Sequence, residues 1–243
     1  MRLLTRIAVT ALRTATATLC TVTALGLTAC APVFAQQQDT APFARLSGPE
    51  VVDKALAATR AATSVRIAVT TRSPDGAPVR AYIATGLRGR CTVTLSMGAA
   101  GTMELVRTGG TVYTQSDEAM LREAGTGRPR ADVDTEARKL TGRWVKARTA
   151  DRYTAQTLSY CDREEFLDRL ARSSGTARKG EVTGDGPTSS LSLTGKAGDG
   201  TWSAAVATEG GPHLLRLRFG TGTPLSVRFS GFGTPFTAAR PAL

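Results

Sequence analysis

Apolar and polar residues alternate along this chain in a way that predicts two runs of β-strands, with helices before and between them. A first helix is expected after Ser47, where Ser47-x-x-Glu50 has the form of a capping box and apolar residues recur at helical spacing to about Thr63. The alternating segments that follow are expected to be strands at residues 64–71, 79–85, 91–97, 102–108 and 111–115.

The middle of the chain predicts helices, and its last third predicts strands again. A short helix is expected within 116–124, a loop at 125–134, and a second helix within 162–175, where Asp162 and Glu165 repeat the capping pattern. The final strands are expected at residues 181–184, 189–194, 201–208, 213–219 and 225–232.

This order of elements predicts an α+β fold. We expect a strongly curved antiparallel β-sheet, a half-barrel of about ten strands, with helices on its concave face. A half-open barrel of this kind is able to enclose an apolar cavity large enough for a lipid. The predicted domain covers residues 47–243.

The residues before this domain have the form of an export signal. A basic beginning is followed by a short apolar segment, residues 14–28, which is too short for a membrane-spanning helix. Leu27-Thr28-Ala29-Cys30 then matches a lipobox. A lipoprotein signal peptidase needs small side chains beside the bond it cuts, and the thiol of the following cysteine receives the lipid.

This pattern predicts that residues 1–29 are removed and that Cys30 anchors the protein to a membrane from outside the cytoplasm. Residues 30–46 have no periodicity and are expected to form a flexible tether. An ordinary signal peptidase has an alternative site after Ala35, and cleavage there would release a secreted protein.

The net charge of the chain suggests an anionic environment. The formal charge is +11 and the isoelectric point about 10.2, so an exported domain of this kind is attracted to anionic head groups and acidic polymers. The basic residues are mostly arginines, and they are scattered rather than clustered. No nucleic-acid partner is therefore expected.

Two cysteines remain after Cys20 is removed with the signal and Cys30 is assigned to the lipid. In an exported domain, Cys91 and Cys161 are expected to form a disulfide, with two buried free thiols as the alternative. His213 is the only histidine and lies far from both in sequence, so neither a metal site nor a cofactor is predicted.

No set of catalytic residues is visible, and the chain is not expected to be an enzyme. A serine-type site would have to be built on His213, which lies in a strand-like segment typical of an ordinary, partly buried histidine. Neither a Gly-x-Ser-x-Gly motif nor a phosphate-binding loop occurs. Asp162 and Glu165 are explained by the start of a helix.

Several short motifs occur in an order that resembles a known family. They are the initial helix leading into residues 64–71, Gly109-Gly110-Thr111-Val112-Tyr113, Gly142-Arg143-Trp144-Val145-Lys146, and the ending Phe229-Ser230-Gly231-Phe232-Gly233-Thr234-Pro235. Together with the lipobox they resemble the LppX/LprG-type envelope lipoproteins of actinobacteria, which share the LolA/LolB-like half-barrel. The resemblance covers about residues 47–240.

The resemblance implies a hydrophobic cavity between sheet and helices that binds or carries acylated lipids or lipoglycans, in a protein we expect to be a monomer. It carries over no catalytic residues. The alternative for the proposed cavity wall is a solid core, in which the same side chains pack against the helices. The residues expected to line the cavity are Val65, Ile67, Val69, Val93, Leu95, Met97, Met103 and Leu105.

A second function stays open from the sequence. Half-barrels of this kind also occur in envelope sensor or scaffold proteins, which bind a protein partner and no lipid. A filled cavity and an exposed basic face favour this second function, whereas an apolar patch at a cavity mouth favours the lipid carrier.

Overall fold

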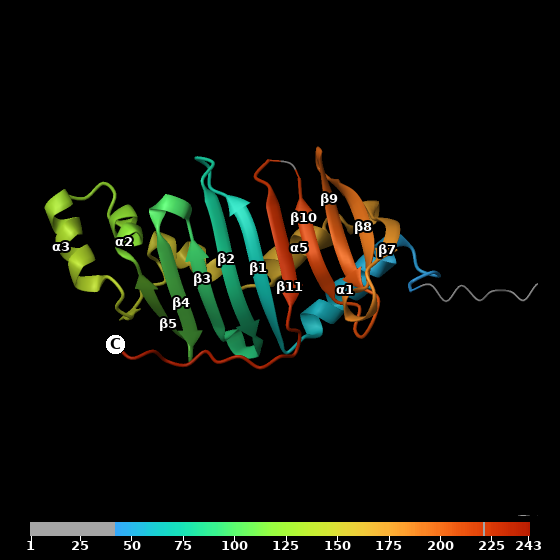
Figure 1. Cartoon of the computed structure of the whole chain (residues 1–243), viewed down its shortest axis with the longest axis horizontal. Coiled ribbons are helices and arrows are strands. Elements are labelled where there is room, and N and C mark those ends of the chain that lie inside the picture. Colours follow the sequence, from blue (N-terminus) through green and yellow to red (C-terminus); the bar gives the residue numbers. More distant parts are fainter. Residues whose placement is uncertain (1–41, 221) are drawn as a thin grey trace, which may run out of the picture. The chain divides into compact units, whose positions relative to one another are not determined.

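A single antiparallel sheet organises the part of the chain that the computed structural model describes, residues 42–220 and 222–243 (Figure 1). Within these residues the sheet has eleven strands, in the order β6-β5-β4-β3-β2-β1-β11-β10-β9-β8-β7. Their bounds are β1 Ser64–Arg72, β2 Pro78–Gly86, β3 Cys91–Ser96, β4 Thr102–Thr108, β5 Thr111–Ser116, β6 Val145–Lys146, β7 Arg178–Thr183, β8 Ser190–Ala197, β9 Gly200–Ala207, β10 Leu214–Phe219 and β11 Leu225–Ser230.

The first and the last strand pair with each other in the middle of the sheet. β1 and β11 are antiparallel neighbours in a register that places Ile67 opposite Phe229 and Val69 opposite Val227. This pairing joins two meanders, β1 to β6 on one side and β7 to β11 on the other, into one continuous sheet.

Helices pack against one face of this sheet, where α1 and α5 lie behind the strands in Figure 1. The helices are α1 Gly48–Ala61, α2 Glu118–Ala124, α3 Arg130–Leu140, α4 Arg152–Ser159 and α5 Glu164–Ala171. α1 begins with the predicted capping box, in which Ser47 N donates to Glu50 Oε2 at 2.7 Å and Glu50 N donates to Ser47 Oγ at 3.4 Å. No helix within the described residues is long and apolar enough to cross a membrane.

The core lies between the helices and the sheet. The strands place every second side chain on the face that the helices cover. α1 and α5 pack apolar side chains against this face, including Val51, Leu56, Leu167 and Leu170. All four are almost completely buried. The opposite face of the sheet carries the polar residues of the alternation, and none of the described helices lies over it, so we call it the open face.

Arg163 links the two central helices. Its Nη1 donates to the carbonyl oxygens of Ala62 at 2.7 Å and Thr59 at 3.3 Å, which lie at the C-terminal end of α1. Arg163 is buried, so these hydrogen bonds form away from solvent. Nearby, the exposed Arg60 forms ion pairs with Glu164 at 2.7 Å and Asp168 at 2.8 Å.

A disulfide between Cys91 and Cys161 connects β3 with the turn between α4 and α5, with the two Cα atoms 5.7 Å apart. The structure therefore has the bond that the sequence favoured over two free thiols. Next to it, Thr85 Oγ1 donates to the carbonyl oxygen of Cys161 at 3.0 Å. Both links fix the α4–α5 turn to the sheet.

The predicted fold class is confirmed: an α+β protein with a curved antiparallel sheet that does not close into a barrel. The predicted loop at 125–134 is wrong in its second half, because α3 begins at Arg130, and α4 was not predicted. The second capping box does not form: Glu164 N donates to Asp162 Oδ1 at 3.0 Å, but Arg163 occupies the N-cap.

The N-terminal segment is only partly described. The predicted signal peptide 1–29, Cys30 and most of the predicted tether lie outside the described residues. The end of that tether, residues 42–46, forms a turn in which Phe43 and Leu46 pack against the core. Lys179 of β7 donates to the carbonyl oxygen of Phe43 at 3.0 Å.

We predict that removing the disulfide with Cys91→Ala and Cys161→Ala lowers the free energy of unfolding by about 4 kcal/mol, because the bond closes a long loop in the unfolded chain. The two cysteines are 70 residues apart. Urea unfolding of the oxidised protein and of the double variant measures the difference. A reductant should lower the stability of the former alone, and equal sensitivity of both proteins would contradict the prediction.

We predict that Arg163→Met lowers the free energy of unfolding by about 1–3 kcal/mol, because the carbonyl groups of Thr59 and Ala62 lose their buried donor. Arg60→Met is the matched control. It removes an arginine with a 39% exposed side chain, and exposed ion pairs contribute about 0–1 kcal/mol. Equal losses in the two variants, measured by urea unfolding, would argue against the capping role of Arg163.

Candidate ligand-binding groove

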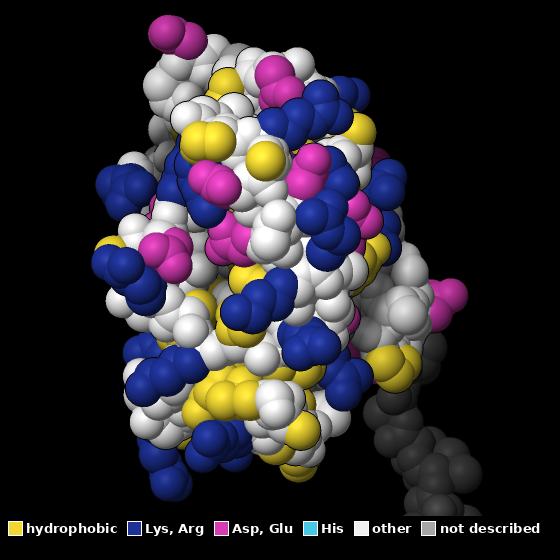
Figure 2. Space-filling model, turned by 90° about the vertical axis from the view of Figure 1, so that its left-hand side faces the viewer, with side chains coloured by type: hydrophobic (Ala, Val, Ile, Leu, Met, Phe, Trp, Pro, Cys, Tyr) yellow, Lys and Arg dark blue, Asp and Glu magenta, His cyan; other side chains and the backbone are white. Residues whose placement is uncertain are grey.

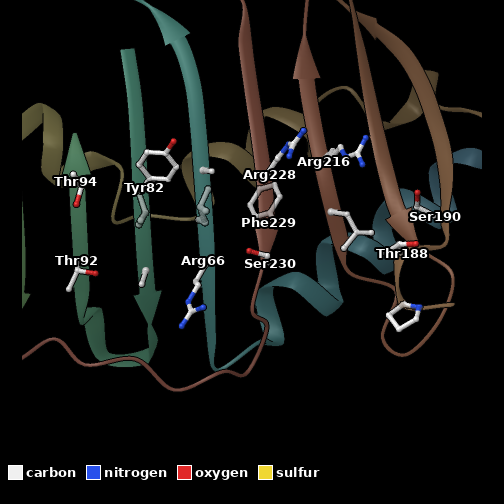
Figure 3. Close-up of a pocket in the computed structure, with 16 residues that line it drawn as sticks. Arg66, Tyr82, Thr92, Thr94, Thr188, Ser190, Arg216, Arg228, Phe229 and Ser230 are labelled. Atoms are coloured by element: carbon white, nitrogen blue, oxygen red, sulfur yellow. The ribbon is translucent and has the colours of Figure 1, made fainter. Parts of the chain in front are cut away.

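The open face of the sheet contains a hollow of about 690 Å³ that crosses its middle (Figure 3). This volume falls within the range of about 300–1,000 Å³ that is typical of small-molecule sites. We call this hollow the groove. Its lining residues are Arg66, Ile67, Ala68, Tyr82, Ile83, Ala84, Thr92, Thr94, Pro187, Thr188, Ser190, Leu215, Arg216, Arg228, Phe229 and Ser230.

The β1–β11 pairing builds the groove. One row of opposed residues runs across the sheet from Thr94 on β3 through Tyr82, Ala68 and Arg228 to Arg216 on β10. These residues come from both meanders, so neither meander alone carries the whole row. Because side chains alternate between the two faces of a strand, the side chains of this row point away from the helix-covered core.

The floor of the groove has an apolar part. Tyr82 is 62% exposed, and Ala68, Ala84 and Leu215 line the same hollow. Tyr82 lies directly opposite Ala68 on one side and Thr94 on the other, so small neighbours leave one face of its ring open. An exposed aromatic ring between small residues is a suitable surface for an apolar chain.

Three arginines line the groove beside this floor. Arg216 on β10 lies directly opposite Arg228 on β11, and Arg66 on β1 lies opposite Ser230 of the same strand β11. Figure 3 shows Arg216 and Arg228 on neighbouring strands above the level of Arg66. Like charges placed directly opposite on neighbouring strands destabilise a sheet.

Acidic side chains do not line this region among the described residues, and Glu104 on β4 continues the row beyond Thr94. Among the described residues that line the groove and the two further hollows toward β7, none is Asp or Glu, whereas Arg178, Lys196 and Arg218 add positive charge. At the end of the molecule formed by α2 and α3, by contrast, acidic side chains lie among basic ones (Figure 2). The arginines found in ion pairs within the described chain are Arg60, Arg122, Arg128, Arg130 and Arg148.

The residues predicted to line a lipid cavity lie on the other side of the sheet. Seven of the eight are buried and Met97 is partly buried against the core, in a packed layer between the sheet and the helices. Of the eight, only Ile67 also borders the groove. A ligand between sheet and helices would therefore require the helices to move away from the strands. The eight residues are Val65, Ile67, Val69, Val93, Leu95, Met97, Met103 and Leu105.

His213 has a packing role in the structure. Its ring stacks on Phe232 with 4.1 Å between the ring centroids, and its buried Nδ1 has no hydrogen-bond partner within the described residues. Burial lowers the pKa of His213 below its ordinary value of 6.5, and the backbone of Ala58 has a smaller effect in the opposite sense.

The fold belongs to the class of open antiparallel half-barrels with helices on one face. Among solved structures it is similar to LprF from Mycobacterium bovis, with a TM-score of 0.55 and 13% identity, over 80% of this chain and 97% of LprF. The sequence-based resemblance to LppX/LprG-type, LolA-like proteins is thereby confirmed for the fold. At this identity the likeness shows the fold alone.

Two further matches have lower scores and carry no argument. A LolA superfamily protein from Nitrosomonas europaea has a TM-score of 0.27 at 12% identity, over 76% of this chain and 92% of that protein. The Pseudomonas aeruginosa MucA/MucB complex has a TM-score of 0.30 at 12% identity, over 80% of this chain and 58% of the matched chain. No sequence-family model and no curated protein sequence matches the chain.

We predict that His213 makes stability fall with acidification. Since its folded-state pKa is lowered, its neutral form contributes stability fully above pH 6.5, and this contribution is lost as the pH falls from 6.5 toward the lowered value. His213→Phe should remove this dependence of stability on pH between pH 7 and pH 5. His213 is the only histidine in the sequence. The carboxyl groups of Glu50 and Asp75 have lowered pKa values and titrate below this pH range. Thermal unfolding across that range measures it, and equal slopes for both proteins would refute the prediction.

Proposed function

We propose that this chain is an exported lipoprotein, tethered to a membrane through Cys30, that binds or carries acylated lipids or lipoglycans in the cell envelope. The observation that carries the proposal is the groove, in which an exposed apolar floor lies beside arginines that form no ion pair within the described residues. That combination matches an amphiphile with an acyl chain and an anionic head group. The half-barrel fold is shared with LprF, and the resemblance of the sequence motifs to LppX/LprG-type lipoproteins implies the same class of ligand.

The energetics of acyl-chain burial are compatible with a groove of this size. An acyl chain of about 16 methylenes gains on the order of 10 kcal/mol when it is fully buried. A chain lying on an open floor loses only part of its contact with water, so its gain is a fraction of this. The remainder would come from head-group contacts, or from entry between helices and sheet beside residues such as Val65 and Leu95.

The alternative is a sensor or scaffold lipoprotein that binds a protein partner. The packed layer between helices and sheet favours it, because the described residues there leave the predicted cavity wall filled. The basic open face would then bind an acidic surface of the partner. In this case no lipid would accompany the purified protein.

We predict that the full chain, expressed with its signal in an export host of its own type, carries a lipid in stoichiometric amount. Native mass spectrometry followed by lipid extraction measures the bound mass and its class. A lipid-free mass that stays unchanged after incubation with envelope lipids would refute lipid binding and favour the protein-partner function. The mass of the N-terminal peptide separates lipidation at Cys30 from cleavage after Ala35.

We predict that Ala68→Trp reduces the amount of bound lipid severalfold, because its indole fills the middle of the groove between Tyr82 and Arg228. Thr70→Trp is the matched control on the same strand and the same face, at a position that does not line the groove. The same native mass spectra measure both variants. Equal lipid content in the two variants would place the ligand elsewhere, such as between the helices and the sheet.

A further inference from the structure

We propose that Arg216 and Arg228, with Arg66 beside them, bind the phosphate of an anionic lipid head group while its acyl chain lies over Tyr82. This inference rests on the proposed function for the lipid, and it adds the head-group class and the residues that recognise it. Four observations on the open face carry it: the register, the small neighbours, a groove lining without acidic side chains among the described residues, and the direction of the apolar floor.

The register makes Arg216 and Arg228 a pair. The two residues are directly opposite on neighbouring strands, where side chains leave the sheet about 5 Å apart. Two positive side chains that leave the sheet this close together repel each other, and no carboxylate lines the groove among the described residues. A bound anion between them would convert this repulsion into two attractive contacts.

The neighbours of the pair leave room for an anion. The next residue across the sheet is Ala205 beyond Arg216 and Ala68 beyond Arg228. Methyl side chains on both sides offer no competing hydrogen bond and no steric obstacle. Both arginines are exposed, so their guanidinium groups are free to converge above the sheet.

Phosphate fits this pair better than a carboxylate does. A guanidinium group binds a phosphate or a carboxylate through two parallel N–H donors, and a carboxylate has only two oxygens to offer. A phosphate group presents three or more oxygens in a tetrahedral arrangement, which allows it to accept from two guanidinium groups at once. Arg66 lies one strand further on and extends the positive charge of the site.

The apolar floor gives the ligand a direction. Tyr82 lies two strands from Arg228, which corresponds to roughly 10 Å at the usual strand spacing. A phosphate held at β10 and β11 would therefore leave its acyl chain to run over β1 and β2 toward Thr94 on β3. The head group would lie over β10 and β11 and the chain over β1 and β2, where Arg66 lies opposite Ala84 of the floor.

The positive charge of the open face also favours an anionic lipid over a second copy of the chain or an uncharged ligand. A second copy bound face to face would bring its own arginines against Arg216 and Arg228, so repulsion disfavours that dimer. An anionic amphiphile satisfies the charge and the apolar floor together. A purely hydrophobic ligand would leave the arginine pair without an anion.

The test compares Arg216→Gln/Arg228→Gln with Arg80→Gln/Arg143→Gln in the full chain. Both double variants lose two positive charges, but Arg80 and Arg143 do not line the groove. The probes are dihexanoyl phosphatidic acid, dihexanoyl phosphatidylcholine and inorganic phosphate, each titrated by calorimetry. Thermal unfolding of the free proteins verifies folding, and the groove variant should be at least as stable because one repulsion is removed.

We expect phosphatidic acid to bind the unmodified chain at least tenfold more tightly than phosphatidylcholine. The groove variant should lose this preference, whereas the control variant should keep it. Loss of the preference in both variants would show a general charge effect and overturn the site. Unchanged phosphatidic acid binding in the groove variant would also overturn the site while leaving lipid binding intact.

Inorganic phosphate separates the two possible sources of the anion. Inorganic phosphate bound as tightly as phosphatidic acid, and lost from the groove variant, would mean that the acyl chain contributes nothing. That result would overturn the head-group assignment. Absence of binding by any lipid probe would contradict the proposed function itself, whatever inorganic phosphate does.

Discussion

The pairing of β1 with β11 is the constraint on which the rest of this structure depends. It joins residues that are far apart in sequence, as in the pairs Ile67–Phe229 and Arg66–Ser230. On the helix-covered face it makes one core out of the apolar residues of two meanders. On the open face it brings Ala68 next to Arg228, and so joins the apolar floor of the groove to its arginine pair.

The helices complete this arrangement from the other side. α1 contacts β9, β10 and α5, and Leu214 N donates to the Thr59 hydroxyl at 2.9 Å, so the helix is tied to the C-terminal meander. Arg163 and the disulfide then hold the α4–α5 turn to α1 and to β3. With this face covered and packed, the groove of the open face is a surface on which a ligand meets both apolar and charged groups without a movement of the helices.

Much of the fold was predictable because strand alternation is a local property. The period of two in segments such as 64–71 and 91–97 marks both the strand and its buried face. α4 escaped prediction because its buried positions include Thr154 and Thr157, which give no apolar pattern. Val93 and Leu95 would be apolar whether they filled a solid core or lined a cavity. The alternation of the strand therefore identifies the face on which they lie but does not distinguish between these two roles.

The arginine pair was beyond sequence analysis for a different reason. From the sequence, Arg216 and Arg228 are recognisable as polar positions of two predicted strands. Only the β10–β11 register shows that their charges lie directly opposite each other. Their position beside Ala68 and Tyr82 depends on a strand more than 140 residues away, according to the β1–β11 register. Local patterns identify such residues singly, and only the long-range pairing makes them a site.

The position of β11 has a consequence for the order in which the chain can fold as it is made. A chain that emerges N-terminus first exposes β1 early, with β2 on one side and an unoccupied hydrogen-bonding edge on the other. That edge finds its partner only when residues 225–230 have emerged. Such distant contacts are slow to form. The eleven-stranded sheet therefore cannot be completed before β11 has emerged, so its two meanders are joined late, whichever of them folds first.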